Sequence, residues 1–420
     1  MADNLKIPYG VFDFKRIRRE GYYYIDKTGY IPLLEQAGSF LFFVRPRRFG
    51  KSLMANMLRC YYDIAEKDNF DTLFGGLEIA RNPTENRNRY QVLYMDFSLV
   101  NRGSGATLQE RFETYIGECM DAFMTRYADQ YGAEFTEAYR KASVAARFTK
   151  ISEYAKLKGF PLYLMLDEYD NFTNQMLRAE GNRPYRDITH GEGFYREWFK
   201  SFKAAFDRIY MTGVSPVTMD DLTSGFNIAA NISQDADFNS MLGFSEDEVL
   251  QLYTDFRGVG KYADGDPAAW VKSFKPWYDG YCFSKSKIGR ESVFNSDMVL
   301  YHLSALVKTG SAPENMVDNC LVDEIAQLKN CEQFVHQICA PELMSVESVF
   351  REILKNGDEA LPVLERFDFE ALDDQKVFFS LFYYYGILTF VRYYHGRNYH
   401  GFPNKMARQV ATAFLEKSSK

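Results

Sequence analysis

The chain has 420 residues, of which 46% are hydrophobic and 25% charged, with a formal net charge of -7 and a pI near 5.5. A chain of this length exceeds one ordinary hydrophobic core, so two or three domains are expected. The acidic balance argues against a surface built throughout to neutralise nucleic-acid phosphates, although a local basic patch stays compatible with it.

The small number of cysteines and the short apolar runs indicate in which cellular compartment the protein is expected. Six cysteines are spread thinly over the chain, without the density of a disulfide scaffold, which fits a reducing cytoplasm. The first residues lack the pattern of a secretory signal, and the longest apolar run, 377–391, is too short to span a bilayer. We therefore expect a cytoplasmic protein with no membrane association.

The first part of the chain, to about residue 240, alternates short apolar runs with helical patterns. Residues 28–36 predict a helix that ends at Gly38, residues 40–44 a buried strand, and residues 53–62 a helix packed on a sheet. Further strands are predicted at 91–96, 162–166 and 208–212. This alternation is typical of an α/β core with a parallel sheet and flanking helices.

A second, mostly helical part begins at Ser245, where Ser245 and Glu248 form a capping box. Helices are predicted around residues 297–306 and 319–339. The last part contains helices, an aromatic segment at 378–391 and a turn at 395–398, an order similar to a winged-helix unit. We therefore predict three domains, covering residues 1–240, 241–340 and 341–420.

The segment between the first strand and its helix has the parts of a phosphate-binding loop. Such a loop needs backbone N–H groups, a helix N-terminus, a lysine for the β and γ phosphates and a hydroxyl for Mg²⁺. The matching residues are Arg45, Pro46, Arg47, Arg48, Phe49, Gly50, Lys51 and Ser52. The usual first glycine is replaced by Arg45, so the motif is degenerate, and a solvated basic turn is the alternative. The planar guanidinium group of an arginine can donate two parallel hydrogen bonds to phosphate oxygens.

A second strand delivers two carboxylates, Asp167 and Glu168, at its carboxyl end. Ligands of open α/β sheets bind at that edge. Asp167 is expected to hold Mg²⁺ together with Ser52, and Glu168 to orient and deprotonate the attacking water. An acidic turn without a function is the alternative. Together with the loop, these residues predict a P-loop NTPase core that binds ATP and Mg²⁺.

Two further groups are weaker candidates. The strand at 208–212 leads into Thr212 and Ser215, either of which is a candidate sensor of the γ-phosphate, with ordinary turn chemistry as the alternative. In ATPases with a catalytic glutamate after the Mg²⁺ aspartate, this strand lies between the loop strand and the acidic strand. Arg196 is a candidate arginine finger, although a surface or salt-bridged arginine is the simpler interpretation.

Six segments together resemble the bacterial AAA-ATPase-like family over nearly the whole chain: Pro8–Gly10, Tyr24–Thr28, Arg45–Leu53, Leu166–Asp170, Thr212–Pro216 and Trp277–Tyr281. In that family an Arg-Pro-Arg-Arg-Phe-Gly-Lys-Ser loop is usual, so the resemblance implies that Arg45 is a family trait. It further implies an ATPase module in which the loop from Arg45 to Leu53 binds nucleotide.

Many members of that family carry a C-terminal domain resembling PD-(D/E)XK nucleases. Its pattern of acids and a lysine is not found in this sequence, so we expect that domain to be absent. The resemblance implies an ATPase module that controls a nuclease, with DNA or a nuclease as a partner of the C-terminal region. The sequence leaves the oligomeric state open.

Other chemistry-bearing residues have simpler interpretations. Cys331, His336 and Cys339 lack a compact fourth ligand, so zinc is not expected. His190 and His302 have no nucleophile nearby in sequence, and core or surface histidines are the default.

The leading hypothesis is therefore Mg²⁺-dependent ATP binding and hydrolysis coupled to a conformational change. One alternative is a nucleotide-dependent switch that binds protein or DNA with little hydrolysis. A third hypothesis, a DNA-binding protein with a vestigial loop, ranks last because the chain is acidic.

Overall fold

The computed structural model describes residues 5–100, 107–172, 193–216, 229–262, 265–318, 346–365 and 375–418. Two compact units are built from interleaved stretches of the chain. The first consists of Met1–Lys27, Val44–Lys51 and Ser233–Lys420, and the second of Thr28–Phe43 and Ser52–Ile232. The division into three domains stays a prediction.

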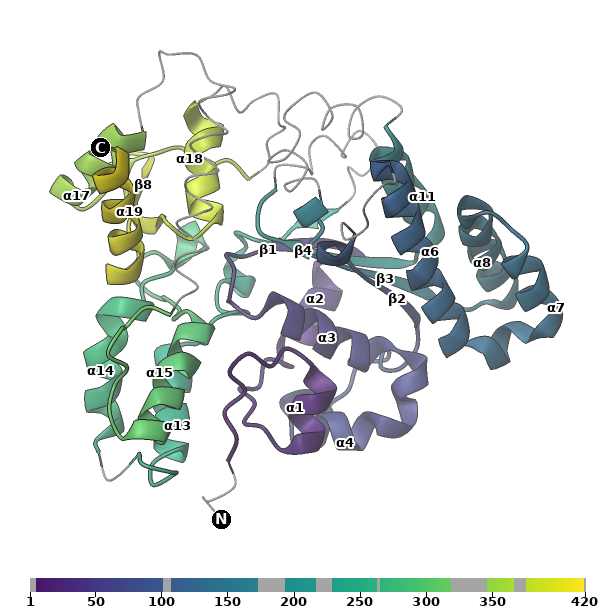
Figure 1. Ribbon diagram of the computed structural model, residues 1–420, viewed down its shortest axis with the longest axis horizontal. Coiled ribbons are helices and arrows are strands. Elements are labelled where there is room, and N and C mark those ends of the chain that lie inside the picture. Colours follow the sequence, from purple (N-terminus) through teal and green to yellow (C-terminus); the bar gives the residue numbers. More distant parts are fainter. Residues whose placement is uncertain are drawn as a thin grey trace. The chain divides into compact units, whose positions relative to one another are not determined.

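The second unit contains a five-stranded sheet in the order β2-β3-β4-β1-β5. Figure 1 labels its strands β1 to β4. Its strands are β1 (Phe40–Val44), β2 (Gln91–Asp96), β3 (Leu162–Asp167), β4 (Arg208–Gly213) and β5 (Ala230–Asn231). Strands β2, β3 and β4 pair in parallel, as do β1 and β5. The four strands predicted from the sequence are confirmed, and β4 lies between β3 and β1 as expected.

Helices cover both faces of this sheet. Tyr163 of β3 packs against Tyr62 of α3 (Lys51–Tyr62), with ring centroids 5.0 Å apart. The preceding residue, Leu162, lines a small cavity together with Phe123 and Phe148 from two other helices. Because successive side chains of a strand point to opposite faces, α3 covers one face, and α6 (Leu108–Arg126) and α8 (Val144–Lys158) cover the other. The α/β fold with flanking helices is therefore confirmed.

The helices of this unit are α2 (Tyr30–Ala37), α3 (Lys51–Tyr62), α4 (Phe70–Phe74), α5 (Glu78–Arg81), α6 (Leu108–Arg126), α7 (Ala128–Arg140), α8 (Val144–Lys158) and α11 (Phe194–Ala205). Gly38 follows the last residue of α2, as predicted. Lys51, the first residue of α3, belongs to the first unit, and the rest of that helix belongs to the second.

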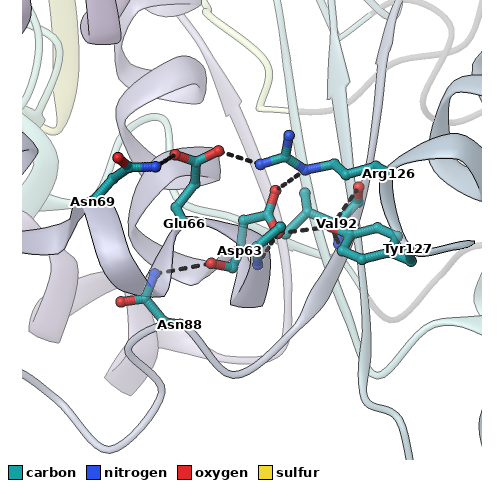
Figure 2. A network of polar contacts seen from close by, with 8 residues as sticks. Asp63, Glu66, Asn69, Asn88, Val92, Arg126 and Tyr127 are labelled. Carbon is teal, nitrogen blue, oxygen red and sulfur yellow. Dashed lines mark hydrogen bonds and ion pairs between the residues drawn. The ribbon is translucent and has the colours of Figure 1, made fainter. Parts of the chain in front are cut away.

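A buried polar network holds the end of α3 to α6 (Figure 2). Asp63 follows α3 and is fully buried, and its carboxylate accepts hydrogen bonds from Arg126 Nε at 2.6 Å and from the Tyr127 hydroxyl at 2.8 Å. Arg126 also pairs with Glu66. The Tyr127 hydroxyl accepts a hydrogen bond from the backbone N–H of Val92 in β2 at 2.7 Å. Breaking one partner of such a network leaves an uncompensated buried charge.

Arg126→Ala should therefore lower the free energy of unfolding by about 3 kcal/mol. Lys141→Ala is the control, because Lys141 pairs with Glu137 on exposed surface, with side chains 74% and 71% exposed; it should cost less than about 1 kcal/mol. Chemical denaturation of both variants measures the difference, and equal losses would contradict the role given to the network.

The helices of the first unit pack around two hydrophobic clusters. Its helices are α1 (Phe14–Glu20), α13 (Glu246–Asp255), α14 (Pro267–Tyr278), α15 (Ser296–Thr309), α17 (Val346–Asn356), α18 (Gln375–Tyr384) and α19 (Lys405–Ser418). The first cluster is formed mainly by α13, α14 and α15. The predicted capping box opens α13: Glu248 N–H donates to Ser245 Oγ at 3.2 Å, and Ser245 N–H donates to Glu248 Oε2 at 2.7 Å.

The second cluster joins α17, α18 and α19 and includes Leu361 and Leu388, which lie next to two strands of a small antiparallel sheet in the order β6-β8-β7. Its strands are β6 (Glu359–Ala360), β7 (Thr389–Tyr394) and β8 (Arg397–Gly401). His395 and Gly396 connect β7 to β8 with φ angles of 48° and 76°, the left-handed conformation of a tight hairpin turn. The predicted turn is confirmed, whereas the winged-helix identity of this region stays a prediction.

Several sequence-based predictions fall outside the described residues: the helix at 319–339 and the residues His190, Cys331, His336 and Cys339. Within the described part of the chain, no helix combines the length and the apolar character needed to cross a bilayer.

His302 of α15 is a core histidine, one of the two default interpretations, core or surface. It is fully buried, and its Nδ1 atom lies 2.6 Å from the Tyr253 hydroxyl. Burial lowers the pKa of His302 to about 4 from an ordinary value of 6.5. The folded protein therefore keeps this ring neutral at pH values at which the unfolded chain protonates it, so stability is lost as the pH falls from about 6.5 towards 4.

Wild-type protein should consequently lose about 2 kcal/mol more of its unfolding free energy between pH 7 and pH 5 than His302→Gln does. Denaturant titrations at both pH values measure this difference. His395→Gln provides the control, because His395 is exposed at the hairpin turn. The same pH dependence in wild type and in His302→Gln would refute the assignment.

Candidate functional site

Residues 45–50 form a loop between β1 and α3, and we call it the β1–α3 loop. Arg48 and Gly50 have φ angles of 70° and 95°, in the left-handed region that non-glycine residues rarely adopt. A Cβ atom added at Gly50 would meet no atom within 4 Å. The backbone therefore turns sharply into α3 beside open space, which is what a loop that wraps an anion requires.

Arg45 lies inside the first unit. Its side chain is 2% exposed, and it donates to the carbonyl oxygens of Ser233 at 2.6 Å and Phe238 at 2.8 Å. Its guanidinium carbon lies 4.2 Å from the centre of the Phe283 ring. A buried charge needs such partners to offset its desolvation. In this structure Arg45 therefore anchors the loop to the first unit. A contact between Arg45 and a phosphate, as predicted from the sequence, would require these hydrogen bonds to break.

The other side chains of the loop differ in burial: two are buried and two are at least partly exposed. Phe49 is buried against Tyr281 and Phe283, with ring centroids 4.9 and 5.5 Å away, and Pro46 is also buried. Arg47 is partly exposed and Arg48 exposed. Arg48 Nη1 lies 2.6 Å from a carboxylate oxygen of Asp297. Of the three loop arginines, Arg47 and Arg48 are therefore more accessible to a ligand than Arg45.

Lys51 opens α3, and its ammonium group donates to the carbonyl oxygen of Pro46 at 3.1 Å. The side chain thus folds back over the loop that precedes it. Ser52 and Leu53 follow in the first turn of α3, and both are partly buried. A helix start carries partial positive charge, so this turn and the Lys51 ammonium together favour an anion.

The acidic pair lies in the second unit, at the carboxyl end of β3. Asp167 is 1% exposed, and its Oδ2 atom accepts a hydrogen bond from the Tyr94 hydroxyl at 3.2 Å. Glu168 has a φ angle of 51°, although it is not a glycine, and its carboxylate accepts from Asn171 Nδ2 at 3.1 Å. Strained backbone of this kind costs of order 1–3 kcal/mol and clusters at functional sites.

The end of β4 lies against the residues that follow Asp167. Tyr169 N–H donates to the Thr212 carbonyl at 3.2 Å, and the Asp170 carboxylate accepts from Ser215 N–H at 2.9 Å. A Cβ atom at Gly213 would lie 2.4 Å from Asp170 Oδ1, so only glycine fits there. These bonds fix the carboxyl ends of β3 and β4 together, as their sequence positions predict.

Thr212 and Ser215 differ in their surroundings. Both are fully buried. The Thr212 hydroxyl has no hydrogen-bond partner among the described residues, whereas the backbone of Ser215 is held on both sides, because its carbonyl accepts from the Tyr169 hydroxyl at 2.5 Å. A buried hydroxyl costs free energy unless something bonds to it. Of the two hydroxyl groups, only that of Thr212 is buried without a hydrogen-bond partner in the described part of the chain.

Sequence reasoning missed Tyr94, Asp96 and Asp170. Asp96 ends β2 directly opposite Asp167 in the strand register, and its position at the end of a predicted strand is the signal by which it could have been found. Tyr94 was not predictable, because a tyrosine within an apolar strand is usually a packing residue. In the described ranges, no group of three or more histidine, cysteine or acidic residues is arranged to hold a metal ion.

Comparisons with known proteins give one family match. A family model described as "Predicted AAA-ATPase" matches residues 8–223, just over half of the chain. A protein from Azotobacter chroococcum mcd 1, described as "Uncharacterized protein in vnfD 5'region", is 29% identical over 280 residues, which cover 66% of this chain and 48% of that protein. The chain therefore spans about half the length of that relative.

Two solved structures are distant likenesses. The Walker-type ATPase PABY2304 of Pyrococcus abyssi is 12% identical, with a TM-score of 0.49 over 93% of this chain and 96% of that one. Cdc6p from Pyrobaculum aerophilum is 10% identical, with a TM-score of 0.24 over 91% of this chain and 88% of that one. Both TM-scores lie below 0.5, so neither likeness indicates a function.

The strain at Glu168 is open to a direct test. Glu168→Gly and Glu168→Ala both remove the bond to Asn171, but only glycine relaxes the positive φ, so the glycine variant should be more stable by about 1 kcal/mol. At Glu137, an exposed position within α7, the order should reverse, with alanine more stable by about 1 kcal/mol. Denaturation curves of the four variants measure this, and the same order at both positions would refute the strain.

Proposed function

We propose that this chain, which belongs to the predicted AAA-ATPase family, binds ATP with Mg²⁺ at the β1–α3 loop and hydrolyses it. The observation that carries the proposal is the loop itself. It leaves a buried strand, turns through two positive φ angles and enters a helix that begins with Lys51 and Ser52. The family match implies nucleotide binding for the same part of the chain.

The proposal requires the loop and the acidic pair to act on one nucleotide. The sheet supports this requirement, because β1 and β3 belong to the same sheet with β4 between them. Nucleotides bind to α/β sheets at the carboxyl ends of the strands. Asp167 is the last residue of β3, and the loop follows the last residue of β1.

Mg²⁺ suits the donors that the second unit offers. Mg²⁺ prefers oxygen ligands and is usually bound through one or two carboxylates together with phosphates and water. Ser52 supplies a hydroxyl and Asp167 a carboxylate, which Tyr94 holds in place by its hydrogen bond. When bound, the ion would neutralise charge on the phosphate oxygens.

The residues of the proposed site would have three separate roles: phosphate binding, proton transfer and recognition of the terminal phosphate. Lys51 and the backbone at the start of α3 would hold the phosphates, with Arg47, Arg48, Phe49, Gly50 and Leu53 shaping the loop around them. Glu168, whose carboxylate Asn171 orients, would accept a proton from the attacking water. The Thr212 hydroxyl, which lacks a partner among the described residues, would bond to the terminal phosphate.

A specific observation favours a second candidate, a nucleotide-dependent switch with little hydrolysis. Arg45, Arg48 and Phe49 are held by residues between Ser233 and Asp297 of the same unit. A loop held in this way would transmit nucleotide binding to those residues whether or not hydrolysis follows. The DNA or nuclease partner that the family resemblance implies stays a prediction, as does the arginine finger.

Lys51→Ala should weaken ATP binding at least about tenfold, whereas Glu168→Gln should retain ATP and slow phosphate release at least about a hundredfold. Calorimetric titration with and without Mg²⁺ measures the first effect, and a phosphate-release assay measures the second. Lys141→Ala, on an exposed face of the second unit, should match wild type in both.

Equal ATP affinity and turnover in wild type, Lys51→Ala and Glu168→Gln would refute the proposed site. Tight ATP binding that depends on Lys51, with negligible phosphate release even in wild type, would instead favour the switch.

A further inference from the structure

Arg48 is joined to the start of α15 through both its side chain and its backbone. Its Nη1 atom lies 2.6 Å from an oxygen of Asp297, in the first turn of α15, and 3.9 Å from one of Asp318, which follows that helix. Ser296 Oγ donates to the Arg48 carbonyl at 3.1 Å. All of these residues belong to the first unit, so these contacts lie within one compact body.

The two carboxylates are more deeply buried than the arginine that faces them. The side chains of Asp297 and Asp318 are 17% and 16% exposed, whereas that of Arg48 is 35% exposed. Burial and the neighbouring Asp318 raise the pKa of Asp297, and Arg48 acts against both. The Tyr9 hydroxyl also donates to Asp318, at 2.5 Å. Arg48 thus offsets a repulsion between two acids.

A guanidinium offers the same planar fork of donors to a carboxylate and to a phosphate. The donors that Arg48 directs at Asp297 are therefore not available to a phosphate at the same time. Arg48 also belongs to the loop that we propose to bind nucleotide, and its φ of 70° means that its backbone is held in place by its surroundings. Its side chain, 35% exposed, extends from this anchored backbone and is held by Asp297.

We propose that Asp297 and Asp318 compete with the phosphates of a nucleoside triphosphate for the guanidinium of Arg48, so that nucleotide binding releases the first turn of α15. The inference rests on the proposed nucleotide-binding function and assigns a regulatory element to that site. Asp297 is a positioning residue, because it acts on the nucleotide only through Arg48.

The consequence for α15 follows from the charges. Once Arg48 turns to a phosphate, Asp297 and Asp318 lose the positive charge between them while they stay largely desolvated. Their repulsion then favours a wider separation of the α15 start from the segment around Asp318. Binding energy at the loop is thereby converted into a change in the C-terminal part of the same unit.

A double-mutant cycle on ATP affinity tests the competition. Calorimetric titration of the full chain with Mg²⁺ and ATP compares wild type, Asp297→Asn, Arg48→Ala and the double variant. Asp297→Asn should tighten ATP binding about tenfold, because Arg48 no longer has to leave a charged partner. In the Arg48→Ala background the same substitution should change affinity less than about twofold.

Asp358→Asn is the matched control. It removes the acid that pairs with Arg392 in the same unit, at 2.6 Å, and neither residue forms a hydrogen bond or an ion pair with the β1–α3 loop. ATP affinity should stay within about twofold of wild type. If Asp297→Asn does not fold, Asp318→Asn replaces it in the cycle, with a smaller tightening of about threefold that also depends on Arg48.

Hydrogen exchange at the start of α15 gives a second measurement. The Met298 N–H, which donates to Asn295 Oδ1 at 3.2 Å, should exchange at least about threefold faster with ATP in wild type, and at an unchanged rate with ATP in Asp297→Asn. Unchanged or slower exchange in wild type would overturn the proposal.

An effect of Asp297→Asn that is absent, opposite in sign or equal in both Arg48 backgrounds would also overturn it. Lys51-dependent ATP binding without coupling between positions 48 and 297 would leave the proposed function standing and refute the competition alone. Absence of ATP binding in wild type would refute both.

Discussion

A guanidinium that is nearly inaccessible to water has to be satisfied by protein atoms, and Arg45 is where this constraint is most severe. Its hydrogen bonds to the Ser233 and Phe238 carbonyls and its place over the Phe283 ring fix the first residue of the β1–α3 loop within the first unit. Without them the buried charge would cost several kcal/mol. The position of the loop depends on these contacts.

The loop also joins two units that the chain builds from interleaved stretches. All of β1 except Val44 and all of α3 except Lys51 belong to the second unit, while Val44–Lys51 belongs to the first. A ligand bound by this loop would therefore contact residues of the first unit, because Arg45, Arg48 and Phe49 connect the loop to the rest of that unit. In the second unit, the Asp63–Arg126 network holds the far end of α3.

Aromatic residues explain much of this packing. Phe and Tyr number 36 and 30, and many tyrosines combine a buried ring with a hydroxyl that bonds to a backbone or carboxylate group. Tyr127 bonds to Asp63, Tyr94 to Asp167 and Tyr169 to the Ser215 carbonyl. Tyrosine in these positions supplies apolar area and satisfies a buried polar group with one side chain.

The sequence by itself determined the strands β1 to β4, the helix after the loop, the capping box of α13 and the placement of Asp167 and Glu168 at a strand end. These features depend on local patterns: apolar runs of strand length, helical spacing and capping residues. The register of β2 against β3, which sets Asp96 beside Asp167, and the bond from Tyr94 were decided by tertiary structure. So were the burial of Arg45 and the pairing of Arg48 with Asp297. Those partners lie up to 249 residues apart in the chain, and only packing of the folded chain determines which distant carbonyl or carboxylate meets a given charge.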